Sequence, residues 1–390
     1  MPDLSNSRIL IVDDVKANVD VLVQLLRDDY KLSVALGGEA ALKAAEKLPP
    51  DLVLLDIVMP GMDGYEVCRR LRANPATAEV PVMFLSALDE VRSKALGFEA
   101  GGNDYLTKPF EALEVKARVH SLLKAKAYSD AVKQKIANEL RIASEIQMGM
   151  LRHQVQEIVD GTGLHAAARM EPAREVGGDF YDIIRVGNDR VVVVVGDVSG
   201  KGVPAALFMA VSTTLARVIG RDHDCPGRIL TLINNALVEQ NPQTMFVTMA
   251  CAVIDLAKGT LRRQRQMCIR DSAKGTLRYA SGGHPSPVRL RSGQPPALPF
   301  DSTGPMVGVF PDVEYTSEEH PFPKGDGYVF YTDGVTEAMN ETGELFGNQR
   351  LLASLDSSAP PLEALLEAVR AHADGYPQSD DITIVTIRRG

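Results

Sequence analysis

The sequence predicts a doubly wound α/β domain at the N-terminus and an α+β domain at the C-terminus, joined by a long helix. At 390 residues the chain exceeds the length that one ordinary hydrophobic core serves. Residues 8–124 alternate short apolar runs with amphipathic stretches, whereas residues 111–153 contain no proline and a single glycine. We therefore expect a first domain over 5–124, a helical linker over 111–153 and a second domain over 160–389.

The N-terminal domain is expected to hold a five-stranded parallel sheet. Short runs of continuous apolar residues are typical of strands that helices cover on both faces. Between the runs, apolar residues recur three and four positions apart, as Val19, Leu22 and Leu26 do, which indicates amphipathic helices. The predicted strands are 8–12, 32–35, 51–55, 80–85 and 105–106.

Polar and charged side chains fall where these strands end: Asp13 and Asp14 after the first, Asp56 at the third, Ser86 at the fourth and Lys108 after the fifth. Ligands of such sheets bind at this edge. Grouped carboxylates repel one another unless a hard cation such as Mg²⁺ lies between them. The cation, a hydroxyl and an ammonium would then offset the charge of a phosphoryl group. Any one of these aspartates or the serine, taken alone, could instead be a helix N-cap.

The motifs ILIVDD, LLDIVMPGMDG, FLSA and DYLTKPF make residues 5–124 resemble the receiver domain of two-component response regulators. The resemblance implies a flavodoxin-like fold, with Asp56 as the phosphoacceptor. It also implies a sensor histidine kinase as the partner from which the phosphoryl group comes. Mg²⁺ would be held by Asp13, Asp14, Asp56 and the carbonyl oxygen of Val58.

The same resemblance assigns further roles around the acceptor aspartate. Ser86 and Lys108 would contact the phosphoryl group, and Tyr105 would be the aromatic switch residue. The Lys108–Pro109 peptide bond is expected to be cis. These assignments describe a site that accepts one phosphoryl group on an aspartate.

The linker has two interpretations. Its apolar positions could form one amphipathic helix packed on a domain, or a parallel coiled coil that makes a homodimer and transmits the receiver's state. The segment ELRIASEIQMGML resembles the helix that precedes SpoIIE-type phosphatase domains, which favours a signalling helix. The residues that recur at helical spacing are Val132, Ile136, Leu140, Ala143, Gln147 and Met150.

The C-terminal domain carries four acidic motifs, VGGDFYD, GDVSGKG, YTDG and SDDIT, each beside a β-rich run. Adjacent glycines let the backbone turn tightly and let a carbonyl face an ion. Four carboxylates that meet at one point could hold two divalent cations about 3.5–4 Å apart. Oxygen ligands favour Mg²⁺ or Mn²⁺ over Zn²⁺. Taken singly, an Asp-Gly pair could be no more than a turn.

In this order the four motifs resemble the PPM (type 2C) serine/threonine phosphatases, and specifically their SpoIIE branch. The resemblance implies an αββα sandwich, two Mn²⁺ or Mg²⁺ ions, and hydrolysis of phosphoserine or phosphothreonine in a protein. The metal ligands would be Asp179, Asp197, Asp333 and Asp380, with the Val198 carbonyl. The usual substrate of this branch is a phosphorylated STAS-domain anti-sigma-factor antagonist, so the output would be release of a sigma factor.

Three further residues near these motifs need separate interpretations. Arg174 precedes the first acid and is a candidate contact for the substrate phosphate, or else an ordinary surface arginine. Asp381 stands where many relatives outside this branch have Asn, which argues against a ligand role. His284, in a GGHP element that also matches the branch, is expected to be structural rather than a general acid, because histidines in glycine-rich turns often bond the backbone.

Two other functions are compatible with parts of the sequence. The segment VGGDF partly matches the GGDEF signature of diguanylate cyclases, but GDVSGKG, YTDG and SDDIT would not follow that signature, so a cyclase is rejected. The competing hypothesis is a non-catalytic module that sequesters its partner through a degenerate phosphatase fold. The presence of all four expected metal acids argues against degeneration.

Composition sets the class of protein. With 45% hydrophobic and 24% charged residues the chain is expected to be globular, and its net charge of −9 argues against nucleic-acid binding. No apolar run approaches the roughly 20 residues of a membrane span, and the N-terminus lacks an export signal. Four scattered cysteines without metal-site spacing indicate reduced thiols. We therefore expect a cytoplasmic protein without a membrane partner.

The hexapeptide AKGTLR occurs twice, at 257–262 and 273–278. Without residues 263–278 the segment reads CAVIDLAKGTLRYASGGH, which predicts two strands joined by a turn. The repeat is either a duplication in a hairpin loop, where added length costs little, or an artefact of sequence assembly. Neither interpretation gives it a function.

Overall fold

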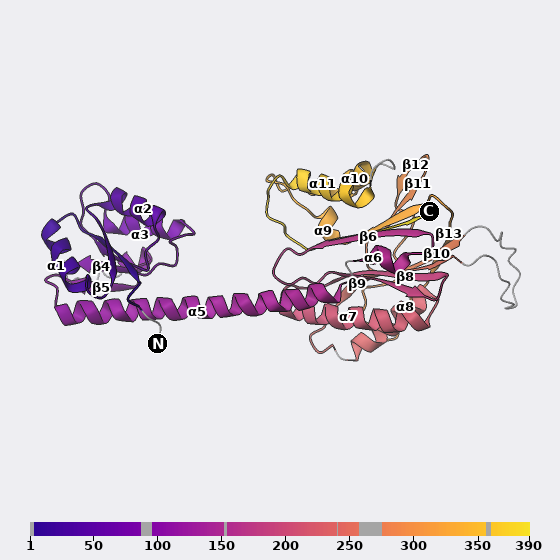
Figure 1. The fold of residues 1–390 in the computed structure, drawn as a ribbon, viewed down its shortest axis with the longest axis horizontal. Helices are drawn as coiled ribbons and strands as arrows, with labels where there is room; N and C mark the ends of the chain where they lie inside the picture. Colours follow the sequence, from indigo (N-terminus) through magenta and orange to yellow (C-terminus); the bar gives the residue numbers. More distant parts are fainter. Residues whose placement is uncertain (1–3, 87–95, 152–153, 240, 257–274, 356–359) are drawn as a thin grey trace, which may run out of the picture. The chain divides into compact units, whose positions relative to one another are not determined.

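The computed structural model describes residues 4–86, 96–151, 154–239, 241–256, 275–355 and 360–390 (Figure 1). The chain divides into two compact units, Met1–Asn138 and Glu139–Gly390. Helix α5 (Ala112–Met150) contributes residues to both units.

The first unit is a five-stranded parallel sheet with helices on both faces (Figure 1). The strand order β2-β1-β3-β4-β5 confirms the predicted doubly wound class. The strands are β1 (Arg8–Val12), β2 (Lys31–Ala35), β3 (Leu52–Asp56), β4 (Val82–Ser86) and β5 (Asp104–Thr107). The helices are α1 (Lys16–Leu26), α2 (Gly38–Lys47), α3 (Gly64–Ala73) and the first part of α5.

Alternate side chains of each central strand enter different cores, because successive residues of a strand point to opposite faces. On β1, Leu10 lies in the core with residues of α2 and α3, such as Val67 of α3. Its neighbour Ile11 lies in the core with residues of α1 and α5, such as Val119 of α5. Helices cover both faces of the sheet, so its central strands are continuously apolar. This continuous apolar pattern is the one that predicted these strands from the sequence.

The second unit is a sandwich of two antiparallel five-stranded sheets with helices outside each sheet (Figure 1). One sheet has the order β13-β10-β9-β8-β7 and the other β12-β11-β14-β15-β6. The strands of the first are β7 (Phe180–Val186), β8 (Arg190–Val198), β9 (Val247–Asp255), β10 (Gly275–Gly282) and β13 (Glu318–Phe322). Those of the second are β6 (Leu164–Glu171), β11 (Val288–Arg291), β12 (Gln294–Ala297), β14 (Gly327–Tyr331) and β15 (Ile382–Arg389).

Helices complete the predicted αββα layers. On β14, Tyr328 and Phe330 lie in the core between the sheets, whereas Val329 and Tyr331 lie in the core beneath α10 and α11. Helices α7 and α8 pack on the other sheet. The helices of this unit are α6 (Val155–Val159), α7 (Val203–Asp222), α8 (Pro226–Val238), α9 (Asp333–Thr336), α10 (Gly347–Ser354) and α11 (Pro361–Ala373).

Helix α7 is the one described helix that is long and apolar enough to cross a membrane, with a mean hydropathy of 1.5 over an 18-residue window. About a third of that window is buried. Length and composition alone are weak evidence of a membrane span, because helices that pack in protein cores meet the same criteria. In this unit α7 packs against β7 and β8.

Strands β9 and β10 pair antiparallel, with Met249 opposite Gly282 and Asp255 opposite Thr276. This is the strand pair predicted on either side of the AKGTLR repeat. Residues 257–274, which contain most of the repeat, lie outside the described residues, as does the end of the predicted linker at His153.

Candidate functional sites

The first candidate site is a group of three acids at the carboxyl edge of the parallel sheet. Ligand atoms of Asp13, Asp14 and Asp56 all lie within 4.8 Å of one another. Lys108 places its Nζ 2.8 Å from Asp13 Oδ2 and 2.9 Å from Asp56 Oδ2. Burial raises the pKa of the Asp56 carboxyl, and the hydrogen bond from Lys108 partly opposes that rise. The structure thus brings together the acids and the lysine that the sequence indicated.

The donor set of this group fits Mg²⁺. Three carboxylates outweigh one ammonium, and the ligands are all oxygens, which a hard divalent cation prefers. Asp13 is held in place by two further donors: the Val15 backbone N–H at 2.8 Å, and the Asn18 side-chain amide at 3.1 Å from Oδ1 and 3.0 Å from Oδ2.

The other residues indicated by the receiver resemblance lie on β4 and β5 or just after β3. Ser86 ends β4 and is buried. Tyr105 is buried on β5, where its ring stacks on Phe84 with centroids 5.5 Å apart. The side chain of Val58 is exposed in the segment after β3. The Lys108–Pro109 bond is cis, as expected.

The second candidate site is formed by four acids from separate parts of the sandwich. Burial, followed by repulsion from Asp333 and Asp380, raises the pKa of Asp197 to about 7. Burial and repulsion from Asp197 raise the pKa of Asp179 well above its ordinary value. The acids therefore lie close enough to oppose each other's ionisation. They are Asp179 before β7, Asp197 in β8, Asp333 at the start of α9 and Asp380 before β15.

These acids fit divalent cations. Buried carboxylates that repel one another stay ionised only beside a compensating positive charge. Among the described residues, no three of the four acids bring ligand atoms within 4.8 Å of one another, unlike the receiver acids. The oxygen donors suit Mg²⁺ or Mn²⁺.

The glycines of VGGD let the backbone approach this second site. A Cβ atom at Gly178 would lie 2.8 Å from the Val198 carbonyl oxygen and 3.5 Å from Asp197 Oδ1. A Cβ atom at Gly177 would lie 2.2 Å from Asp381 Oδ2. The Val198 carbonyl therefore faces the loop that carries the first acid.

Asp381 and Thr332 hold that loop. The Asp381 carboxylate accepts hydrogen bonds from the backbone N–H of Ala173 at 2.8 Å and of Gly178 at 2.7 Å. The Thr332 hydroxyl donates to Asp179 Oδ2 at 2.7 Å. The Asp381 carboxylate thus serves to hold this loop. Thr332 lies inside the YTDG motif, but the motif alone gave it no role.

Two other residues at this site had no predicted role there. Lys201, inside GDVSGKG, has its Nζ 3.2 Å from Asp380 Oδ2. Gln147 of α5 is buried: its Nε2 donates to the Gly177 carbonyl at 2.6 Å, and the Gly177 N–H donates to its Oε1 at 3.1 Å. Helical spacing places Gln147 in the seam of the linker, whereas in the structure its side chain holds the VGGD loop.

Arg174 and His284 complete the predicted set. Arg174 is exposed on the loop that leads to Asp179. His284 is buried, and its Nδ1 lies 2.9 Å from the Thr248 hydroxyl. Burial lowers the pKa of His284 to about 4, so the ring is neutral near pH 7. A neutral, enclosed imidazole agrees with the expected structural role.

A receiver-type sheet with a group of three acids at its carboxyl edge, followed by an αββα sandwich with four clustered acids, defines a receiver-linked protein of the PP2C phosphatase class. The family model described as Stage II sporulation protein E (SpoIIE) matches residues 187–264 and 266–390, just over half of the chain. The chain therefore belongs to the SpoIIE family. The model of the response regulator receiver domain matches residues 9–120.

Individual relatives match the receiver part, the phosphatase part or nearly the whole chain. The chain is 42% identical over 138 residues to the response regulator PleD of Caulobacter vibrioides, covering 35% of this chain and 30% of PleD. It is 26% identical over 412 residues to protein IcfG of Synechocystis sp., covering 97% of this chain and 58% of IcfG. The chain thus spans less than two thirds of either relative. The SiaA-PP2C domain of Pseudomonas aeruginosa is 25% identical with a TM-score of 0.52, covering 66% of this chain and 98% of that domain.

Proposed function

We propose that this chain is a response regulator in which phosphorylation of Asp56 controls a metal-dependent protein serine/threonine phosphatase. The observation that carries the phosphatase assignment is the convergence of four buried or half-buried acids, in which burial and repulsion between the carboxylates raise the pKa values of Asp179, Asp197 and Asp333. Two Mn²⁺ or Mg²⁺ ions, when bound, would activate water and offset the charge of the phosphate. Their ligands would be Asp179, Asp197, Asp333, Asp380 and the Val198 carbonyl.

The chain's own residues would position this chemistry. Thr332 and Asp381 fix the loop of Asp179 through the hydrogen bonds described above. Arg174 is exposed five residues before Asp179, where its guanidinium could meet the substrate phosphate.

The receiver would be phosphorylated on Asp56. Mg²⁺ held by Asp13, Asp14, Asp56 and the Val58 carbonyl would offset the charge of the incoming phosphoryl group. Ser86 and Lys108 would contact that group and Tyr105 would respond to it, with a sensor histidine kinase as the source.

The family supports the proposed partner of the phosphatase. In the SpoIIE branch the usual substrate is a phosphorylated STAS-domain protein, and we propose the same substrate here. A homodimer through α5 is supported by apolar side chains that the helix leaves exposed, Val132 at 40% and Ile136 at 51%. These side chains could pair with the same helix of a second copy.

The phosphatase assignment is tested with p-nitrophenyl phosphate in the presence of Mn²⁺. Asp197→Asn and Asp333→Asn should each lower kcat/KM at least about 100-fold, because each removes charge from the ion site. Asp301→Asn, at an exposed aspartate of the same unit, is the matched control and should keep the wild-type rate. Wild-type activity that survives both site variants would refute the two-metal mechanism. A wild-type chain that binds a phosphorylated STAS protein without hydrolysing it would instead be a sequestering module.

A further inference from the structure

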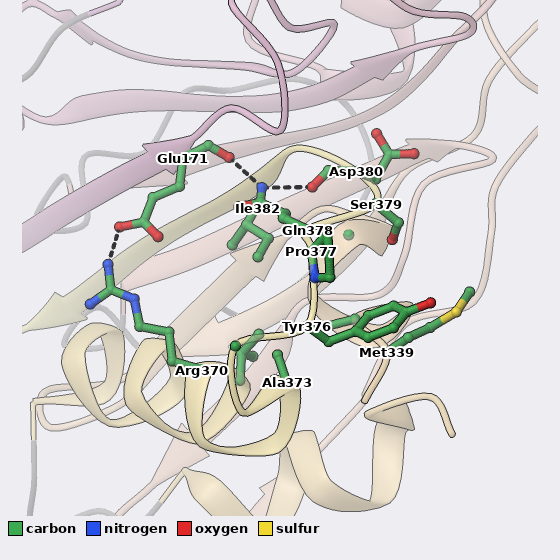
Figure 2. A pocket seen from close by; sticks show the side chains of 14 residues that line it. Glu171, Met339, Arg370, Ala373, Tyr376, Pro377, Gln378, Ser379, Asp380 and Ile382 are labelled. Atoms are coloured by element: carbon green, nitrogen blue, oxygen red, sulfur yellow. Dashed lines mark hydrogen bonds and ion pairs between the residues drawn. The ribbon is translucent and has the colours of Figure 1, made fainter. Parts of the chain in front are cut away.

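A pocket with a volume of about 230 Å³ lies directly beside the phosphatase acids (Figure 2). Its lining comes from the end of β6, from α9 and the residues after it, from α11 and from the segment before β15. Asp380 lines the pocket, as does Gly334, which follows Asp333. The pocket therefore shares a wall with the site where the phosphate would be hydrolysed.

The rest of the lining is largely apolar. Two of the apolar side chains are large and partly open to solvent, Met339 at 37% exposure and Tyr376 at 41%. Both side chains line the pocket and are labelled in Figure 2. Exposed apolar groups gathered in a concave site are typical of binding surfaces. The apolar lining includes Ala338, Met339, Val369, Ala373, Tyr376 and Ile382.

Three of the polar and charged residues of the pocket, Glu171, Arg370 and Gln378, are engaged with one another. Arg370 donates to Glu171 Oε1 at 2.5 Å. The Gln378 amide donates to the carbonyl of Glu171 at 2.8 Å and to that of Asp380 at 2.7 Å, which fixes the segment before β15 (Figure 2). A charged ligand would have to displace these contacts, whereas an apolar one would not.

We propose that this pocket receives one apolar side chain of the phosphoprotein substrate, of the size of Leu, Met or Phe, from a residue close to the phosphorylated Ser or Thr. The volume favours a side chain over a small molecule, whose sites usually span about 300–1,000 Å³. The shared wall at Asp380 places such a residue next to the phosphate. This inference rests on the proposed phosphatase function and adds a sequence preference to it. Burial of one such side chain should favour the matching substrate about 10-fold to 100-fold.

The test uses the full-length chain with Mn²⁺ and a panel of phosphoserine peptides. A single Leu is moved through the positions on either side of the phosphoserine in a peptide whose other flanking residues are Ala. Phosphate release gives kcat/KM for each peptide, and p-nitrophenyl phosphate reports the metal centre separately. We expect one Leu position to raise kcat/KM at least about 10-fold over the all-Ala peptide, mainly through KM.

Two variants then assign the preference to the pocket. Ala373→Trp fills it and Tyr376→Ala removes its aromatic wall, so each should bring the Leu-to-Ala ratio of kcat/KM close to one. Ala371→Trp is the matched control, because Ala371 is an exposed alanine of the same helix that does not line the pocket. It should keep the wild-type ratio.

The outcomes separate the two proposals. If the wild type hydrolyses neither p-nitrophenyl phosphate nor any peptide, the phosphatase function fails, and the pocket proposal fails with it. If it hydrolyses both but no Leu position matters, the pocket proposal alone is overturned. The same holds if the preference survives in Ala373→Trp and Tyr376→Ala. If the wild type shows no preference for Leu over Ala and Ala373→Trp changes the oligomeric mass, the pocket would instead bind a second copy of the chain.

Discussion

His284 makes the phosphatase unit sensitive to acid at the level of one side chain. Burial lowers the pKa of this imidazole to about 4, below the ordinary value near 6.5. A group with a lowered pKa adds stability above its unfolded pKa, and that stability is lost as the pH falls toward the folded pKa. The free energy of unfolding should therefore decrease between pH 6.5 and pH 4, by about 3 kcal/mol from this residue.

The measurement is denaturant unfolding of chelator-treated protein at several pH values, so that release of metal does not contribute. Carboxyl groups titrate in the same pH range. The informative quantity is therefore the slope of the free energy of unfolding against pH in the wild type, minus the same slope in His284→Gln. His165→Gln, at an exposed histidine of the same unit, should keep the wild-type slope. Identical slopes in wild type and His284→Gln would show that the ring contributes nothing to acid sensitivity.

The SDDIT motif shows how far single residues can be assigned from sequence. Asp380 and Asp381 are adjacent and chemically identical, so spacing alone could not separate their roles. In the fold Asp380 joins the repelling cluster, whereas Asp381 accepts from Ala173 and Gly178. Both residues lie before β15, which begins at Ile382, so strand periodicity does not separate them. Only the contact with a loop 208 residues away in sequence reveals the division.

Helix α5 is the element whose end reaches the phosphatase site. Gln147 satisfies both the N–H and the carbonyl of Gly177, two residues before Asp179. In Gln147→Leu both backbone groups would lose their buried partner, and the first metal acid would be held less firmly. Loss of such supporting contacts typically weakens metal binding 10-fold to 100-fold. We expect the Mn²⁺ concentration for half-maximal hydrolysis of p-nitrophenyl phosphate to rise at least about 10-fold.

Gln134→Leu supplies the comparison for this prediction. Gln134 is an exposed glutamine of the same helix, so its replacement changes the same side chain without touching the loop. It should leave the Mn²⁺ dependence as in the wild type. An unchanged Mn²⁺ dependence in Gln147→Leu would mean that the loop holds its position without α5.

At the level of elements, the strands were predictable and the contacts between elements were not. Strands β1 and β3 are apolar on both faces, and β8 and β14 precede or contain acids of the predicted motifs. Their runs are local, so the sequence displays them directly. The Gln147–Gly177 pair joins residues 30 positions apart, and helical spacing assigned Gln147 only to a seam. Tertiary hydrogen bonds of this kind leave no periodic signal.

For the whole molecule, the substrate pocket is the clearest feature that the sequence did not indicate. It is built from segments around Glu171, Gly334 and Ile382, which the topology of the sandwich brings together. Its residues are ordinary core and surface types, and no motif marks them. The metal acids were found because their chemistry requires particular residues, whereas an apolar pocket can be made from many combinations of side chains.

Control of the phosphatase by the receiver is the property that needs both units. Helix α5 runs without a break from Ala112 to Met150. Its Val115 and Val119 are buried in the receiver core, and its Gln147 holds the loop of the second site. A change of packing around phosphorylated Asp56 that shifted α5 would therefore act on the loop that carries Asp179. We predict that the phosphoryl mimic beryllofluoride raises phosphatase activity at least about 5-fold, the lower end of typical coupling between sites.

The comparison is kcat for a phosphorylated STAS protein with and without beryllofluoride, in the wild type, Asp56→Asn and Gln147→Leu. The rise should vanish in Asp56→Asn, which lacks the acceptor carboxylate. It should be weakened in Gln147→Leu, where α5 no longer holds Gly177, even at saturating Mn²⁺. Equal wild-type rates with and without the mimic would refute control by the receiver. A rise that persists in Asp56→Asn would show that beryllofluoride acts at another site, because the receiver carboxylate that binds it is then absent.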